Sequence, residues 1–487
     1  MDSKYITYIG VDDVEIDLFE SQYVVPEGMC YDSYLVKGDR IAVMDTVDAR
    51  MAGEWMARLS AALGGRKPDY LVLQHMEPDH SGAVMAFLNE YPDTTIVCSQ
   101  QAANFLLQFN ETLRAEIRPL TAPATGAAKE CCCGNNGVPA TGTAKECCCG
   151  NNGIPAEVTA KAHCCGNNGV PANEASKEHC CDNNGTHAEV TAKEHCCGNN
   201  GVPANEVETL RAKIRTVKEG DCLELGEGAE LQFIAAPMVH WPEVMMTWFA
   251  AEKTLFSADG FGKFGVYDAD PDDWACEARR YYFNICGKYG AQVAKVLQKA
   301  ARLDIQRICP LHGPVLTGDR LAEAVRLYTV WSSYKPETPE GILIAYASIH
   351  GNTAAAARRL ANILEAKGAP KVAVTDLCRD DVAEAIADAF RMGTMVLACS
   401  TYDGGIFPPM KCFLDKLAMK GFCGRRVALV ENGTWAPLAA KLMRASLESM
   451  KSIDILDRTL TIKSSLKESQ VPELEALADL LLTPSSK

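Results

Sequence analysis

The stretch Leu71-Val72-Leu73-Gln74-His75-Met76-Glu77-Pro78-Asp79-His80 sets four imidazole or carboxylate side chains directly after an apolar run. Residues 68–75 have the apolar content of a buried strand. Residues 81–91 then predict a helix with Ser81 as its N-cap. Strand ends that direct polar side chains into one cleft are where an α/β scaffold usually carries its chemistry. The stretch therefore predicts an α/β fold with part of a metal or catalytic site at the end of this strand.

Three later segments repeat this construction, since each is a short apolar run that reaches an imidazole or a carboxylate. They are Met238-Val239-His240-Trp241, Leu255-Phe256-Ser257-Ala258-Asp259 and Ile308-Cys309-Pro310-Leu311-His312. A lone histidine beside a strand is more often an ordinary core or surface residue, but the coincidence of four such segments favours one binuclear metal site. Its candidate ligands are three carboxylates and three imidazoles, namely His75, Glu77, Asp79, His240, Asp259 and His312. A ligand set this rich in carboxylates suits iron or manganese better than zinc.

The arrangement resembles the flavodiiron proteins, or A-type flavoproteins, which join a metallo-β-lactamase-like diiron domain to a flavodoxin-like domain. In the hydrolytic version of the motif, His-x-His-x-Asp-His, a histidine stands where this chain has Glu77. The resemblance implies that each iron has its own ligands and that one carboxylate bridges them: His75, Glu77 and His240 for the first iron, Asp79 and His312 for the second, and Asp259 as the bridge. His80 matches a position that can approach the second iron, and it is left out of the expected ligands.

A second α/β pattern follows residues 334–341, which form a Pro-rich, charged linker. Residues 342–347 predict a buried strand, and the loop Ser348-Ile349-His350-Gly351-Asn352-Thr353 leads from it into an Ala-rich helix that ends near Lys367. A loop of this kind predicts an anion site, because the free N–H groups and the dipole at a helix N-terminus favour negative charge. The loop resembles the phosphate loop of flavodoxins.

Two further predicted strands, at residues 395–399 and 427–430, end in loops of similar chemistry. The first loop, Ser400-Thr401-Tyr402-Asp403-Gly404-Gly405, resembles the second flavin loop of the family. The second, Glu431-Asn432-Gly433-Thr434-Trp435, matches the family at Trp435 but departs from it at Glu431 and Pro437. The resemblance implies that FMN binds to residues 348–353, 400–405 and 432–435, at the carboxyl ends of a doubly wound parallel sheet.

A tract of repeats interrupts the first pattern. A 16-residue unit occurs five times over residues 125–204, most clearly at 157–172 and 189–204, and it contains 12 of the 22 cysteines. Its Gly-Asn-Asn-Gly sequence favours turns, and each unit offers little apolar surface for burial. We therefore expect a disordered tract. Binding of soft metals such as Zn(II) or Cu(I) by the His-Cys-Cys clusters is the alternative.

Two copies of one segment enclose this tract. Glu111-Thr-Leu-Arg-Ala-Glu-Ile-Arg118 precedes it, and Glu208-Thr-Leu-Arg-Ala-Lys-Ile-Arg215 follows it, so the copies start 97 positions apart (208 − 111). The chain without one such length looks like an ordinary flavodiiron protein. Residues 111–207 are thus predicted to be a duplication tract within a complete enzyme. The expected organisation is a metallo-β-lactamase-like αββα sandwich of residues 1–110 and 208–333, followed by a flavodoxin-like FMN domain of residues 342–487.

Charge and hydropathy exclude several classes of partner. The net charge of −15 and the lack of a basic stripe argue against nucleic-acid binding, because phosphates are bound by clustered lysines and arginines. No stretch approaches the roughly 18 apolar residues needed to span a bilayer. Residues 1–20 lack the apolar segment of a signal peptide. We therefore expect a cytoplasmic protein that binds neither nucleic acid nor a membrane.

Ten cysteines lie outside the repeats and show no pairing pattern, so in the cytoplasm they are expected to be reduced. No Cys-x-x-Cys occurs, so the chain has no rubredoxin- or ferredoxin-type module of its own. Electrons must then come from a separate donor protein. The resemblance implies that this donor is a rubredoxin.

The resemblance implies an FMN- and diiron-dependent oxidoreductase that reduces O₂ to water, NO to N₂O, or both. It also implies a head-to-tail homodimer, in which the flavin of one subunit faces the irons of the other. Two alternatives stay open. One is a zinc hydrolase of the metallo-β-lactamase class with an attached flavodoxin domain, against which Glu77 argues. The other is a metal-buffering or redox-sensing protein that acts through its cysteine repeats.

Overall fold

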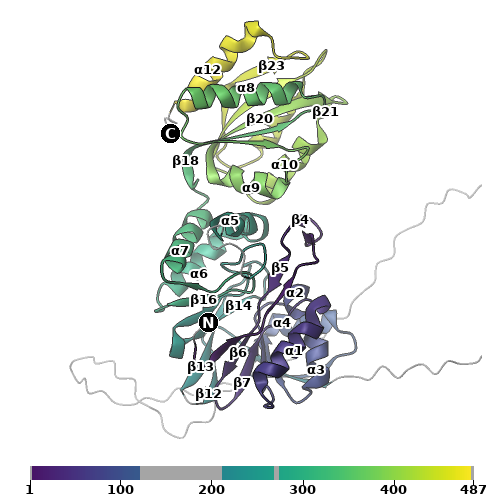
Figure 1. The fold of residues 1–487 in the computed structure, drawn as a ribbon, viewed down its shortest axis with the longest axis vertical. Helices are drawn as coiled ribbons and strands as arrows, with labels where there is room; N and C mark the ends of the chain where they lie inside the picture. Colours follow the sequence, from purple (N-terminus) through teal and green to yellow (C-terminus); the bar gives the residue numbers. More distant parts are fainter. Residues whose placement is uncertain (1–2, 121–210, 227, 268–273, 484–487) are drawn as a thin grey trace, which may run out of the picture. The chain divides into compact units, whose positions relative to one another are not determined.

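The computed structural model describes residues 3–120, 211–226, 228–267 and 274–483. The five predicted repeats, and the disorder expected of them, lie outside these residues. The first part of the chain forms two β-sheets with helices on their outer faces (Figure 1).

The first of these sheets has seven strands. From one edge to the other they are β1 (Ile6–Tyr8), β6 (Tyr34–Lys37), β7 (Ile41–Met44), β8 (Tyr70–Leu73), β9 (Thr95–Ser99), β11 (Arg211–Val217) and β10 (Arg114–Pro119). Strands β7, β8, β9 and β10 share one direction, because a helix after each of the first three returns the chain to the same end of the sheet. These helices are α1 (Ala52–Leu63), α3 (Val84–Glu90) and α4 (Gln100–Phe109). Strand β11 is parallel to its neighbours β9 and β10. Two hairpin-like pairs complete this half, β2 (Val11–Asp13) with β5 (Met29–Tyr31) and β3 (Leu18–Phe19) with β4 (Tyr23–Val24).

The second sheet has six strands and its own set of helices. In spatial order the strands are β12 (Cys222–Gly226), β13 (Ala229–Ala235), β14 (Met245–Phe249), β15 (Thr254–Phe256), β16 (Arg307–Cys309) and β17 (Leu316–Thr317). Helices α5 (Trp274–Ile285) and α6 (Gly290–Ala300) lie between β15 and β16 in the chain, and α7 (Gly318–Ser332) follows β17.

Alternation along the strands explains why both faces of the sheets are apolar. On β8, Tyr70 and Val72 belong to the core between the two sheets, where they join Phe233 of β13. Leu71 belongs to the core beneath the helices, where it joins Trp55 of α1. Successive side chains of a strand point to opposite faces, so a strand covered on both faces must be apolar throughout. The four layers form the αββα sandwich that was expected.

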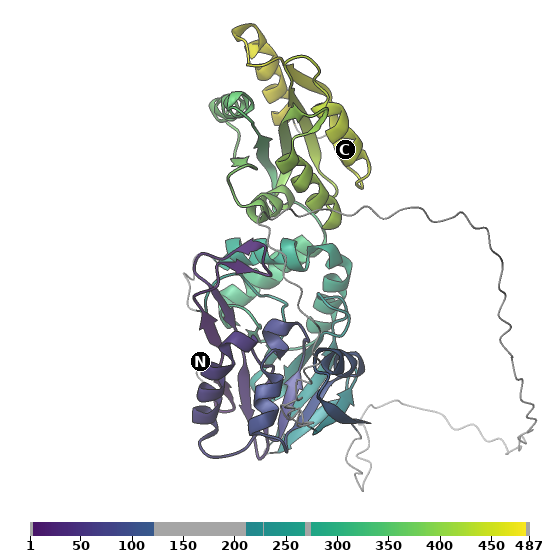
Figure 2. The same ribbon diagram turned by 90° about the vertical axis from the view of Figure 1, so that its right-hand side faces the viewer.

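A third sheet follows, in the spatial order β19 (Val372–Asp376), β18 (Thr338–Ala347), β20 (Met392–Tyr402), β22 (Arg426–Asn432) and β23 (Asp454–Ile462). These strands are all parallel, and the short β21 (Gly405–Ile406) pairs back onto β20. Figure 2 shows helices on both sides of this sheet. One side carries α8 (Asn352–Ala366) and α12 (Val471–Leu482), the other α9 (Val382–Arg391), α10 (Pro408–Met419) and α11 (Ala439–Glu448). This is the doubly wound, flavodoxin-like order that was expected.

Two local expectations differ from the structure. The helix predicted for residues 81–91 is two helices, α2 (Pro78–Ser81) and α3, and Ser81 is no N-cap: its hydroxyl donates to the carbonyl oxygens of Met76 and Glu77. A proline at the first helical position starts a helix there instead. In addition, β18 begins at Thr338, inside the predicted linker, because Thr338 pairs with Met392 before the register shifts.

The two copies of the duplicated segment form β10 and β11, which are neighbours at one edge of the first sheet. Among the described residues, no helix is long and apolar enough to cross a membrane.

Candidate metal centre and cofactor cavity

A buried carboxylate holds the end of β8 in place. Asp45 accepts hydrogen bonds from the backbone N–H of Gln74 at 2.7 Å and of His75 at 3.3 Å, and from the Gln74 side chain at 2.9 Å. Burial outweighs these bonds and raises the pKa of Asp45 to about 6. The strand end, and with it His75, is therefore fixed by three hydrogen bonds that the Asp45 carboxylate accepts.

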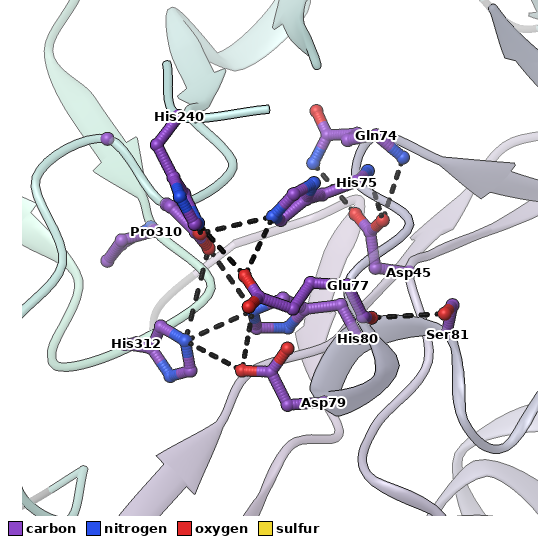
Figure 3. Close-up of polar contacts among 12 residues, drawn as sticks. Asp45, Gln74, His75, Glu77, Asp79, His80, Ser81, His240, Pro310 and His312 are labelled. Carbon is purple, nitrogen blue, oxygen red and sulfur yellow. Dashed lines mark hydrogen bonds and ion pairs between the residues drawn. The ribbon is translucent and has the colours of Figure 1, made fainter. Parts of the chain in front are cut away.

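One group of nitrogen and oxygen donors lies around His75 (Figure 3). The Nε2 of His75 is 3.2 Å from Glu77 Oε2 and 3.3 Å from Asp259 Oδ2. The Nε2 of His240 is 2.9 Å from the same Glu77 oxygen and 3.0 Å from the same Asp259 oxygen. Ligand atoms from the four residues lie within 4.8 Å of one another, which is close enough for one metal ion to contact all of them.

A second group lies beside the first. The Nε2 of His80 is 3.3 Å from Asp79 Oδ2 and 3.0 Å from His312 Nε2, and this His312 nitrogen is 3.2 Å from Asp79 Oδ2. Asp259 Oδ1 is 3.1 Å from His80 Nε2, whereas Asp259 Oδ2 faces the first group. The carboxylate of Asp259 thus lies between the two groups, as a bridging ligand would.

Hydrogen bonds behind the imidazoles fix their orientation. His75 Nδ1 is 2.9 Å from Glu243 Oε1, which also accepts the backbone N–H of Met76 at 3.0 Å. His312 Nδ1 is 2.7 Å from the carbonyl oxygen of Cys30. Because a carboxylate and a carbonyl oxygen only accept, each Nδ1 carries a proton, and each Nε2 is the nitrogen that can bind a metal.

The charges of the two groups are strongly linked. Burial lowers the pKa of His240, but the adjacent carboxylates of Asp259 and Glu77 outweigh it and raise this pKa to about 9. Burial also opposes protonation of His312, and Asp79 beside it raises the pKa to about 9. In turn, burial raises the pKa of Asp259, while His75 and the other imidazoles lower it well below its usual range.

The carboxylates show whether the residues fit a pair of metal ions. Both oxygens of Asp79 and of Asp259 are buried and make no hydrogen bond of acceptable geometry to the described residues. A buried carboxylate without hydrogen bonds raises the free energy of the folded protein unless a cation binds it. The donors are imidazole nitrogens and carboxylate oxygens without sulfur, which suits iron or manganese. The residues present therefore fit two such ions.

The structure brings together all six residues that the sequence singled out and adds His80, which had been left out. It also adds Glu243 and Cys30, which hold imidazoles from behind. Neither has a recognisable signal in the sequence: Glu243 is 168 positions from His75, and Cys30 is 282 positions from His312. Contacts of such long range depend on the packing of the two sheets.

A cavity of about 480 Å³ opens at the carboxyl ends of the C-terminal sheet. All of the residues predicted to hold a flavin line it except Gly351 and Gly405, and Ala436 and Ser464 line it in addition. The predicted residues that line it are Ser348, Ile349, His350, Asn352, Thr353, Ser400, Thr401, Tyr402, Asp403, Gly404, Asn432, Gly433, Thr434 and Trp435. Trp435 at its rim is 90% exposed, so its ring is free to cover a bound molecule.

Hydrogen bonds join the three loops around this cavity. Gly351, with a φ of 85° that favours glycine, starts α8 and donates its N–H to Ser348 Oγ at 3.1 Å. Thr353 Oγ1 is 2.9 Å from Ser400 Oγ and accepts from Asn432 Nδ2 at 3.3 Å. Gly351 therefore shapes the first loop, and Thr353 connects it to the other two.

The departures from the family pattern in the third loop have structural roles. Glu431 is buried, and its carboxylate accepts the Ala440 N–H at 2.9 Å and the Thr461 hydroxyl at 2.8 Å. It thereby satisfies a free donor at the start of α11. Pro437 packs against Gly433, where an added Cβ would lie 2.8 Å from the proline Cα. Both departures stabilise the loop at the rim of the cavity.

Solved structures share this fold. The flavodiiron protein from Giardia intestinalis superimposes with a TM-score of 0.73 at 19% identity, over 98% of this chain and 94% of the other. The rubredoxin:oxygen oxidoreductase from Desulfovibrio gigas superimposes with a TM-score of 0.73 at 20% identity, over 99% and 96%. The fold is that of the flavodiiron proteins.

Sequence comparisons agree with the flavodiiron fold and confirm the resemblance. The family model described as "ODP family beta lactamase" matches residues 202–313. An anaerobic nitric oxide reductase flavorubredoxin from Vibrio vulnificus is 23% identical over 91% of this chain and 71% of its own length. One from Salmonella typhi is 22% identical over 97% and 78%.

Proposed function

We propose that this chain is a flavodiiron oxidoreductase that reduces O₂ to water, NO to N₂O, or both. The observation that carries the proposal is the pair of donor groups that share Asp259, with a carboxylate, Glu77, where hydrolytic relatives have histidine. The same chain also carries a cavity lined by flavodoxin-like loops. The relatives support this reading: one is named a nitric oxide reductase and another a rubredoxin:oxygen oxidoreductase.

Under this proposal His75, Glu77 and His240 hold one iron, Asp79 and His312 hold the other, and Asp259 bridges them. The position of His80 supports it as a further ligand of the second iron. Its Nε2 lies 3.1 Å from Asp259 Oδ1 and 3.3 Å from Asp79 Oδ2, so it faces the same space as the other ligand atoms. FMN is held by residues 348–353, 400–405 and 432–435, with the phosphate at the start of α8, where helix N–H groups are free.

When bound, reduced FMN and two ferrous ions would supply four electrons together, enough to convert O₂ and four protons to two waters. The protein's part is to keep the ligands oriented and charge-balanced. Glu243 holds the His75 ring by its Nδ1, and the Cys30 carbonyl oxygen does the same for His312. The buried carboxylates offset the positive charge of the metals, which limits the cost of changes in oxidation state.

The remaining parts of the proposal concern organisation and partners. We assign residues 1–110 and 208–333 to the diiron domain, 334–341 to the linker and 342–487 to the FMN domain. The electron donor is a separate protein such as a rubredoxin, and the active form is a head-to-tail homodimer. The cytoplasm is the proposed location; the ten described cysteines are all unpaired, as in a reducing compartment.

The test is anaerobic. The protein is purified without oxygen, iron, zinc and FMN are quantified per chain, and reoxidation of the reduced protein is followed with O₂ and with NO. About two irons and one FMN with rapid reoxidation are expected, and the gas that reacts faster is the preferred substrate. Two zincs and a flavin that reacts with neither gas would overturn the proposal in favour of a hydrolase.

A further inference from the structure

The duplicated segment forms two neighbouring strands that are aligned with each other residue by residue. β10 and β11 pair in parallel, and each residue of β10 faces the residue 97 positions later, as Arg114 faces Arg211. This offset equals the spacing between the two copies in the sequence, which begin at Glu111 and Glu208. Each copy is thus paired in register with the other.

Of the two copies, only β11 occupies an interior position of the sheet. It pairs with β9 on one side and with β10 on the other, and Ala212 and Ile214 are almost wholly buried. β10 lies at the edge, where the equivalent Ala115 and Ile117 are only half-buried. The family-model match also includes the second copy and not the first. β11 therefore has the place of the original strand, and β10 is the additional one.

The side chains that fill the interior position are present in both copies. The alanine and the isoleucine that β11 buries recur at the same positions of β10. Within the eight duplicated residues the copies differ only where Glu116 faces Lys213, and both side chains are exposed. This difference sets opposite charges at facing positions, between the facing arginine pairs Arg114–Arg211 and Arg118–Arg215. It therefore offsets part of the repulsion between the arginines whichever copy is interior.

A proline near the end of β10 is compatible with either position. The N–H of Leu120 donates to the carbonyl oxygen of Thr216 at 2.8 Å, so Pro119, which faces Thr216, directs its own backbone groups away from β11. At the sheet edge the missing N–H of a proline costs no hydrogen bond. With the same register beside β9, Pro119 would again be directed away from its inner neighbour, and its missing N–H would cost one hydrogen bond to β11 on the outer side.

We propose that β10 and β11 are exchangeable: either copy can occupy the position beside β9, so the chain carries a spare strand for its first sheet. In the exchanged form Glu116 faces Thr95, where Lys213 faces it now. The connection allows this, because α4 leads directly from β9 into β10. In the exchange β10 moves inward, and β11 leaves the place beside β9 for the sheet edge. The inference concerns the fold and does not depend on the proposed function.

The first test places a charge at the interior position. Ile214 is 1% exposed, so Ile214→Asp excludes β11 from the place beside β9. In a chain that lacks residues 111–207, only β11 is available, and I214D should abolish the cooperative thermal transition measured by circular dichroism. In the full chain β10 should replace it, and I214D should melt cooperatively near the parent. Equal loss of folding in both chains would overturn the proposal. A deletion chain that fails to fold even with Ile214 intact would overturn it as well.

Matched variants separate exchange from simple tolerance of the charge. Ile117→Asp in the full chain should change the transition little, because β11 stays in place. The double variant I117D/I214D leaves no apolar copy and should lose the transition altogether. A double variant that still melts cooperatively would show that the interior position tolerates aspartate, and it would overturn the proposal.

A disulfide can identify the occupant directly. Atoms two strands apart are about 10 Å from each other, beyond the reach of a disulfide, whereas adjacent strands are within it. In the I214D chain, Thr95→Cys with Glu116→Cys should cross-link under mild oxidation, and Thr95→Cys with Lys213→Cys should not. Peptide mapping by mass spectrometry distinguishes these links from those of native cysteines. The opposite pattern would show that β11 keeps its place.

Discussion

The carboxylate of Glu243 lies 2.9 Å from His75 Nδ1 and has no exposure to solvent. This contact holds a candidate ligand from behind, so we expect Glu243→Gln to lower the iron affinity about 10- to 100-fold without loss of the fold. Equilibrium dialysis against a competing chelator measures the affinity. Glu230→Gln, at an exposed carboxylate of β13, is the control and should leave it unchanged. An affinity equal to that of the control would exclude a role for Glu243 in orienting His75.

His80 should be a ligand and not a bystander. Its Nε2 is 3.1 Å from Asp259 Oδ1, inside the second donor group. Replacement by asparagine removes an imidazole lone pair, and we expect His80→Asn to retain one tightly held iron per chain and to lose the second more readily. Iron analysis after graded chelation measures both. If the variant retains two irons with unchanged affinity, His80 is not a ligand.

Metal uptake should depend on pH in a defined direction. The carboxylates of Asp259 and Asp79 raise the pKa values of His240 and His312 to about 9, so both imidazoles hold protons below that pH and a metal must displace them. Apparent affinity should therefore rise by about tenfold per pH unit for each displaced proton, from pH 7 up to about 9, and then level off. Ferrous-ion titrations across this range, with proton release followed in weak buffer, test the expectation. A pH-independent affinity would contradict it.

The third loop of the flavin cavity should not tolerate a side chain at Gly433. An added Cβ would lie 2.8 Å from the Pro437 Cα, so Gly433→Ala forces the loop to shift and should cost roughly 1–3 kcal/mol. We expect FMN, titrated into deflavinated protein and followed by fluorescence quenching, to bind more weakly. Gly53→Ala in α1, where an added Cβ meets nothing within 4 Å, is the control. Equal FMN affinity in the two variants would argue against a close fit at this loop.

Deletion of residues 111–207 should leave the enzyme intact. Strand β11 already provides the pairing with β9, so the shortened chain keeps every ligand and every lining residue of the flavin cavity. Iron content, FMN content and the rate of reoxidation by O₂ and NO should match those of the full chain. Loss of all activity on deletion, with metals and flavin retained, would favour a function that resides in the cysteine repeats.

Particular residues show which parts of the site and of the fold the sequence could predict. His75, Glu77 and Asp259 were predictable because each follows an apolar run, and strand ends in an α/β fold direct side chains to a common edge. The flavin loops were predictable for the same reason. The helix at residues 81–91 was not, because Pro78 starts a separate helix, and the local pattern does not rank two competing starts.

The sequence by itself determined the chemical types of the ligands, the three loops of the second site and the duplication at residues 111–118 and 208–215, since all of these are local patterns. The tertiary structure decided which donors converge: that Asp259 lies between two groups, that His80 joins one of them and that Glu243 orients His75 across 168 positions. It also decided that the two copies pair with each other in register. These relations arise when separate sheets and strands pack together, and no spacing along the chain encodes a contact between side chains that far apart.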